Sequence, residues 1–200
     1  ALTKDLFDTQ FGTVGRSAEL INNTNTMAAI PVASKTSIEK AIFHIAKKMN
    51  VQEDVLFLTL TSHGGDKLLE MSNPPLALDN VDAPWLRQTL DKSGIKWRVI
   101  VVSACYSGSF IEDLNSPTTL IITASAADKT SFGCSNEAEY TYFGQAFFAE
   151  SLPKYRRFQS AFAAAKQRIT AREKAMGFEP SEPQFVIGDT MKIALPDFEK

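Results

Sequence analysis

The chain has 200 residues, of which 44% are hydrophobic, and its formal net charge is −2. This length and composition suit one globular domain with a well-formed core. The weak negative charge gives no electrostatic basis for binding nucleic acid or an anionic membrane surface, so we expect neither as a partner of this segment. Two cysteines, Cys105 and Cys134, are too few to form a disulfide framework.

The first quarter of the chain predicts two helices with a short strand between them. Residues 4–11 have the pattern of the second half of an amphipathic helix, so we expect a further segment upstream. Residues 17–23 predict a short strand. Residues 36–39 have the spacing of a capping box, and apolar residues at helical spacing follow over 38–49. His44 lies off that apolar stripe and is interpreted as a surface residue.

From residue 55 onward, predicted strands alternate with predicted helices. Apolar runs with β-branched residues predict strands at 55–60, 99–102, 118–124 and 185–188. Between them, Asp82 has the place of a helix N-cap, followed by Pro84 in the first turn and by Gly94 at the end. Further helices are expected at 110–114, 140–148 and 160–176, and a charged, frayed tail closes the chain. This alternation predicts an α/β fold with a mainly parallel sheet and helices on both faces.

Two of these strands end in residues that carry chemistry. The strand at 55–60 runs into Ser62, His63, Gly64 and Gly65, and the strand at 99–102 runs into Ser103, Ala104 and Cys105. Open α/β sheets bind their ligands at the carboxyl ends of such strands. Neighbouring parallel strands would therefore bring His63 and Cys105 together as a thiol–imidazole pair.

Such a pair has the parts needed for acyl transfer. An imidazole can take the proton of a thiol, which becomes a nucleophile only as the thiolate. The backbone N–H groups of Gly64 and Cys105 are candidates for an oxyanion hole, because Gly64 has no side chain to keep a carbonyl oxygen away. The small residues Ser107 and Gly108 follow the nucleophile and place no bulky side chain below it.

Each residue taken alone has a simpler interpretation. A buried cysteine at a strand end is usually a small hydrophobic residue, and His-Gly after a strand is often only a turn. The joint placement of both at equivalent strand ends favours the catalytic pair. A phosphate site at Gly64 and Gly65 is the weaker alternative, because the fuller glycine pattern and a P-loop lysine are missing.

The segments FLTLTSHGG (57–65) and VIVVSACYSG (99–108) resemble the legumain-like cysteine peptidases, family C13 of the caspase-fold clan, in their bacterial branch. Residues 123–125, 130–134 and 141–144 also resemble legumain segments. The resemblance implies a caspase-like three-layer sandwich, with Cys105 as nucleophile and His63 as general base. It implies no metal or organic cofactor and makes Cys134 a noncatalytic residue. It also implies a first strand for which this chain has no candidate, which leaves the residue that orients His63 unassigned.

Three positions depart from the legumain pattern. Tyr106, Gln145 and Ser62 stand where legumains carry acidic residues. The first two positions belong, by resemblance, to the pocket that reads the residue before the cleaved bond, so a strict preference for Asn or Asp is not carried over. Ser125 is retained and is expected on the pocket wall.

The sequence therefore predicts one caspase-like peptidase domain over residues 1–200, incomplete at its N-terminus, that hydrolyses peptide bonds in a peptide or protein substrate. Two alternatives stay open: a transpeptidase that uses the same pair, and a noncatalytic caspase-like scaffold or binding module. We expect a soluble domain, the cytoplasmic or periplasmic part of a longer bacterial protein that carries a membrane anchor or another domain. The compartment and the oligomeric state are left open.

Overall fold

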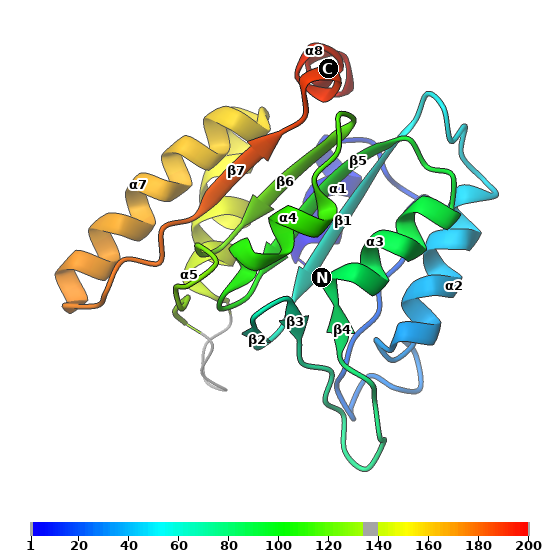
Figure 1. Ribbon diagram of the computed structural model, residues 1–200, viewed down its shortest axis with the longest axis horizontal. Helices are drawn as coiled ribbons and strands as arrows, with labels where there is room; N and C mark the ends of the chain where they lie inside the picture. The colour runs from blue at the N-terminus through cyan, green and yellow to red at the C-terminus, as the bar shows by residue number, and fades with distance from the viewer. Residues whose placement is uncertain (1, 134–139, 200) are drawn as a thin grey trace.

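The computed structural model describes residues 2–133 and 140–199, and Figure 1 shows their course. The strands are β1 (Val55–Thr61), β2 (Gly64–Gly65), β3 (Leu68–Leu69), β4 (Val81–Asp82), β5 (Trp97–Ser103), β6 (Thr119–Thr123) and β7 (Gln184–Ile187). The α-helices are α1 (Leu2–Gln10), α2 (Lys35–Ala46), α3 (Ala83–Lys92), α4 (Ile111–Leu114), α5 (Tyr142–Gly144), α6 (Leu152–Tyr155), α7 (Phe158–Met176) and α8 (Asp189–Phe198). A 3₁₀ turn, η1 (Ser107–Phe110), and a π-helical stretch, η2 (Gln145–Ser151), join some of them.

The main sheet has the strand order β1-β5-β6-β7. Strands β1, β5 and β6 are parallel, and β7 runs antiparallel to β6 at one end of the sheet. The prediction of a mainly parallel sheet is confirmed. A second, antiparallel sheet of β2, β3 and β4 follows directly on the carboxyl end of β1.

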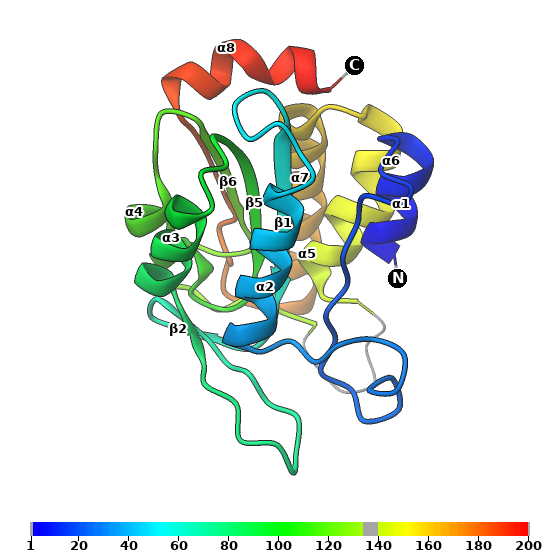
Figure 2. The same cartoon turned by 90° about the vertical axis from the view of Figure 1, so that its right-hand side faces the viewer.

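Helices cover both faces of the main sheet (Figure 2). On one face, α2, α3 and α4 pack against side chains such as Ile100 and Val102 of β5. On the other face, α1, η2, α6 and α7 pack against Val99 and Val101 of the same strand. Because successive residues of a strand point to opposite faces, β5 contributes to both cores, which explains its unbroken apolar sequence.

The first residues of α3 and α2 show how local sequence determines where a helix begins. Asp82 is the N-cap of α3 and accepts a hydrogen bond from the Trp85 N–H at 2.8 Å, as predicted. The expected capping box at 36–39 is wrong, because α2 begins earlier. Its N-cap is Ser34, which forms a capping box with Ser37. A serine at both positions satisfies the same free backbone donors that the threonine and glutamate were expected to satisfy.

Two further expectations at the ends of the chain need correction. Residues 17–23 form no strand, since their polar groups bond to a neighbouring loop: the Ile21 N–H donates to the Pro31 carbonyl, and the Asn22 amide bonds to Ala33. The residues after β7 are helix α8, because buried Met191 and Leu195 give that segment an apolar side.

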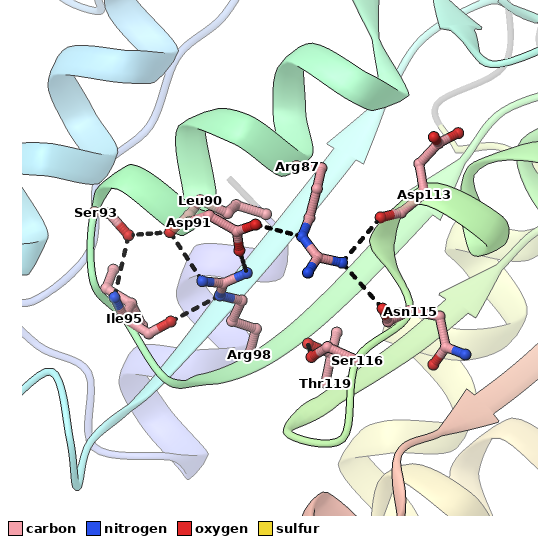
Figure 3. Close-up of polar contacts among 10 residues, drawn as sticks. All are labelled: Arg87, Leu90, Asp91, Ser93, Ile95, Arg98, Asp113, Asn115, Ser116 and Thr119. Carbon is pink, nitrogen blue, oxygen red and sulfur yellow. Dashed lines mark hydrogen bonds and ion pairs between the residues drawn. The ribbon is translucent and has the colours of Figure 1, made fainter.

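A buried arginine fixes the amino end of β5, the end opposite the predicted site (Figure 3). Arg98 is only 8% exposed. Its guanidinium donates to the carbonyls of Leu90 and Ile95 at 2.9 and 2.7 Å and pairs with Asp91 at 2.7 Å. Arg87 pairs with the other oxygen of Asp91, so two cations share one carboxylate. This network ties α3 to the start of the strand that carries Cys105.

Candidate active site

The register of the neighbouring strands β1 and β5 brings His63 and Cys105 to equivalent positions. Thr61 of β1 lies opposite Ser103 of β5, and each chain then continues for two residues, to His63 and to Cys105. The Ser62 N–H donates to the Ser103 carbonyl at 3.4 Å, so the pairing extends beyond the strand ends. Neighbouring strands lie about 4.8 Å apart. The side chains of His63 and Cys105 therefore start from adjacent backbone segments at the carboxyl end of the two strands.

Gly64 lies in direct contact with the backbone at Cys105. A Cβ atom built on Gly64 would lie 2.3 Å from the Cys105 carbonyl oxygen and 2.8 Å from the Ala104 Cβ. No side chain fits there, so this turn needs glycine for close approach and not for a positive φ. The close approach shows that the His63 turn packs on the cysteine segment itself.

The turn after Cys105 has an unusual backbone. Tyr106 has φ 56° and ψ 18°, a left-handed conformation that costs a residue with a side chain roughly 1–3 kcal/mol. Two segments hold it there. The Tyr106 N–H donates to the Lys129 carbonyl at 2.7 Å, and the Tyr106 carbonyl accepts from the N–H and hydroxyl of Ser109 at 3.0 and 2.6 Å. The sharp turn separates Cys105 from the buried η1 that follows.

Two buried serines, Ser107 and Ser125, bond to each other beneath this turn and are called the serine seam below. The Ser125 hydroxyl accepts from the Ser107 N–H and donates to the Ala104 carbonyl, both at 3.1 Å. In return, the Ser107 hydroxyl accepts from the Ser125 N–H at 3.1 Å. Gly108 approaches the backbone of residues 125–127 so closely that a Cβ would lie 2.5 Å from the Ala127 nitrogen. The β5 and β6 ends therefore act as one rigid unit.

Ser131 is the residue that contacts the cysteine sulfur. Its N–H points at the Cys105 Sγ over 3.3 Å, its hydroxyl lies 3.7 Å from the sulfur, and its carbonyl lies 3.5 Å away. An N–H aimed at the sulfur stabilises negative charge there. Sequence reasoning did not single out this residue, because 26 positions separate it from Cys105 and no local pattern marks the contact.

Two backbone N–H groups beside the site, those of Gly64 and Cys105, make no backbone hydrogen bond within the described residues. The Glu70 N–H donates to the His63 carbonyl at 2.9 Å, and Gly64 pairs with Leu69 one step further along the hairpin. Hydrogen-bonded and non-hydrogen-bonded pairs alternate in an antiparallel ladder, so the Gly64 N–H points away from β3. Among the described residues, the Cys105 N–H makes no backbone hydrogen bond. His63 is exposed, and its imidazole has no hydrogen-bond partner in residues 2–133 and 140–199.

The four predicted pocket residues lie in different settings. The Ser62 hydroxyl bonds to the Glu70 carbonyl, and Ser125 is fully buried in the serine seam. Tyr106 is half-buried on the turn after Cys105. Gln145 lies in η2 and bonds to Glu150 of the same stretch and to Arg172 of α7. Their contact with substrate stays a prediction.

Comparisons with known proteins identify the family of the chain. A model of the peptidase C13 family matches residues 19–193. The chain belongs to this family. A legumain of Canavalia ensiformis is 40% identical over 88 residues, which span 40% of this chain and 18% of that protein. The segment thus matches only about a fifth of that legumain's length.

The fold comparison adds a caspase. The crystal structure of caspase-1 from Spodoptera frugiperda matches with a TM-score of 0.60 and 18% identity, covering 93% of this chain and 77% of the caspase. At that identity the likeness concerns the fold alone, and it confirms the predicted caspase-like architecture of this C13 family member.

The remaining predictions concern Cys134, metal binding, membrane-spanning segments and the origin of the chain. Cys134 falls outside the described residues. Over residues 2–133 and 140–199, no three His, Cys, Asp or Glu side chains gather as a metal site. None of the helices described is both long and apolar enough to span a bilayer. The bacterial origin stays a prediction.

Proposed function

We propose that this domain is a cysteine peptidase in which Cys105 is the nucleophile and His63 the general base and acid. The observation that carries the proposal is the shared strand register, with Gly64 packed on the Cys105 carbonyl, which brings thiol and imidazole to one sheet edge. Membership of the C13 family supports it. The substrate is a peptide or protein chain.

The reaction proceeds in two halves. His63 takes the thiol proton, and the Cys105 thiolate attacks the scissile carbonyl carbon to form a tetrahedral oxyanion. The N–H groups of Gly64 and Cys105 bind that oxyanion. The C–N bond then breaks, the imidazolium gives its proton to the leaving amine, and a thioester remains. His63 next takes a proton from water, the hydroxide attacks the thioester, and the thiolate leaves with the acid product.

The site residues that surround the pair have supporting roles in this scheme. The N–H of Ser131 donates to the sulfur after His63 has taken the thiol proton. The serine seam keeps the Cys105 backbone in place while the carbonyl changes geometry. Because the Tyr106 N–H is already bonded to Lys129, it contributes no donor to the oxyanion.

The test combines alkylation with cleavage. Iodoacetamide labelling followed by mass spectrometry gives separate rates for Cys105 and Cys134, so the second cysteine is an internal control. We expect Cys105 to react faster near neutral pH, and His63→Ala to lower its rate. His44→Ala, which removes an exposed histidine on α2, is the matched control and leaves the rate unchanged.

Cleavage of a peptide library completes the test. Cys105→Ala abolishes turnover, and His63→Ala lowers it by about 10²–10⁴-fold. Product masses show whether water or an amine takes the acyl group. Normal cleavage by Cys105→Ala contradicts the assignment. Absent cleavage together with an unreactive Cys105 favours a noncatalytic scaffold.

A further inference from the structure

An aromatic wall begins beside the cysteine. Ser131 touches the Cys105 sulfur, and the next residue, Phe132, stacks on Phe178 with ring centroids 4.5 Å apart. The Phe132 ring also lies 6.3 Å from that of Tyr142, whose N–H donates to the Phe132 carbonyl at 3.0 Å. These three rings form a continuous surface that leads from the nucleophile toward α7.

A guanidinium lies on the far end of this wall. The Arg172 Cζ is 3.6 Å from the centroid of the Tyr142 ring, and its Nη1 donates to the Gln145 Oε1 at 2.9 Å. Arg172 comes from the C-terminal half of α7, and Gln145 begins η2 directly after α5. Figure 1 shows α5 at the same end of the sheet as β2 and β3. Arg172 remains exposed to solvent.

The charge of Arg172 is not cancelled within the described residues. Its neighbour on α7, Arg168, pairs with Glu150 at 3.0 Å. The Gln145 Nε2 donates to the other oxygen of Glu150 at 3.1 Å, which turns the amide oxygen toward Arg172. Gln145 is neutral, so within the described residues it orients Arg172 without compensating its charge. In residues 2–133 and 140–199, no carboxylate pairs with it.

Such a cation suits a carboxylate ligand. A guanidinium has five N–H donors in a rigid fork, and only one of them bonds to Gln145 here. The Tyr142 ring fixes its plane, which reduces the entropy lost when a second partner binds. Planar, bidentate pairing of Arg with a carboxylate uses the remaining donors.

We propose that Arg172 is a specificity residue, which binds the carboxylate of an Asp or Glu side chain in a peptide whose scissile bond lies at Cys105. This rests on the proposed function. An extended substrate seated on the sulfur passes Ser131 and the aromatic wall, and its acidic side chain reaches the guanidinium. Gln145 is the positioning residue, because it holds Arg172 without neutralising it.

The test compares isosteric substrates. In a peptide that the protein cleaves, Asp and Asn are exchanged at each position near the scissile bond in turn, and kcat/KM is measured for each pair. We expect one position at which Asp is preferred, by about three- to tenfold, since an exposed charge pair is partly screened. Arg172→Gln removes that preference, so the ratio of kcat/KM for the Asp peptide to kcat/KM for the Asn peptide falls to about one.

Two further variants sharpen the comparison. Gln145→Glu places a carboxylate beside Arg172, so it abolishes the acidic preference while the arginine is kept. Lys166→Gln removes another exposed cation of α7, which lines a groove beside Phe185, and it keeps the preference. A larger preference for a phosphorylated serine than for Asp would identify a phosphate site and overturn the carboxylate assignment.

The two proposals fail in different ways. Equal cleavage of all Asp and Asn pairs by a cysteine-dependent enzyme overturns the role of Arg172 and leaves the peptidase standing. If no cleavage occurs, binding of the same peptides to Cys105→Ala still decides the matter. Tighter binding of one acidic peptide that is lost in Arg172→Gln supports the subsite, and equal binding overturns it.

Discussion

Replacing Gly64 by alanine tests whether the close approach of the His63 turn to Cys105 matters for reactivity. The new methyl carbon would lie 2.3 Å from the Cys105 carbonyl oxygen, whereas ordinary contact begins at 3.4 Å. The backbone must therefore separate by roughly 1 Å, a misplacement that can cost about 10²-fold in rate. Because the clashing atoms belong to backbone and to the Cβ of Ala104, no flexible side chain can relieve the clash.

The assay measures three quantities on Gly64→Ala: kcat/KM on a cleaved peptide, the alkylation rate of Cys105, and the free energy of unfolding. We expect both rates to fall by about two orders of magnitude and stability to fall by about 1–3 kcal/mol from overpacking. Gly65→Ala is the matched control, since a Cβ there meets nothing within 4 Å. Equal rates for the two variants would refute the packing argument.

Two further predictions concern stability rather than the site. Arg98→Met should lower the free energy of unfolding by about 1–2 kcal/mol, because the buried Ile95 carbonyl loses the donor that Arg98 gives it. The loss is limited because the Leu90 carbonyl keeps its bond from Ser93 and the exposed Asp91 carboxylate keeps Arg87. The alkylation rate of Cys105 stays unchanged; denaturant unfolding measures the stability, and an unaltered midpoint contradicts the role of Arg98. Burial raises the pKa of Asp82, but hydrogen bonds from Lys35 and from a backbone N–H of α3 outweigh it, so the pKa of the folded carboxyl lies below 3.8. This stabilisation is present above that pH and is lost as pH falls through the folded pKa. Asp82→Asn therefore costs about 0.5 kcal/mol at pH 7, a small value because the side chain is 37% exposed. The difference from wild type shrinks in acid, as thermal unfolding at several pH values measures, and a difference that does not change with pH contradicts the argument.

The strands and the pairing of their ends could be predicted because buried parallel strands leave a strong local pattern. The apolar run at 99–102 has few alternatives to a central strand, and the same holds for 118–124. The direction of β7 could not be read from its sequence, because an apolar run of four residues is equally consistent with parallel or antiparallel pairing. Its place beside β6 is settled by tertiary contacts, such as the close packing of Gly188 on Ser116 and Pro117.

Some residues of the candidate site could likewise be predicted from the sequence, and others could not. His63 and Cys105 stood out because each follows a strand end, and each lies two residues beyond the paired Thr61 and Ser103. Ser131 and Arg172 carried no such mark, since their contacts depend on how a loop and a distant helix fold back on the sheet. Gln145 was found by resemblance, but its partner on α7, Arg172, could be known only from the structure.

The position of β1 at the end of the described sheet affects the mechanical character of the proposed pair. Strand β5 is hydrogen-bonded along both sides and buried on both faces, whereas β1 has a ladder on one side only. Local opening of a strand becomes easier as it has fewer ladder bonds and less buried surface. Within the described residues, Cys105 thus follows the strand with ladder bonds on both sides, and His63 follows one with ladder bonds on a single side. We therefore expect local opening of this chain to displace His63 more readily than Cys105.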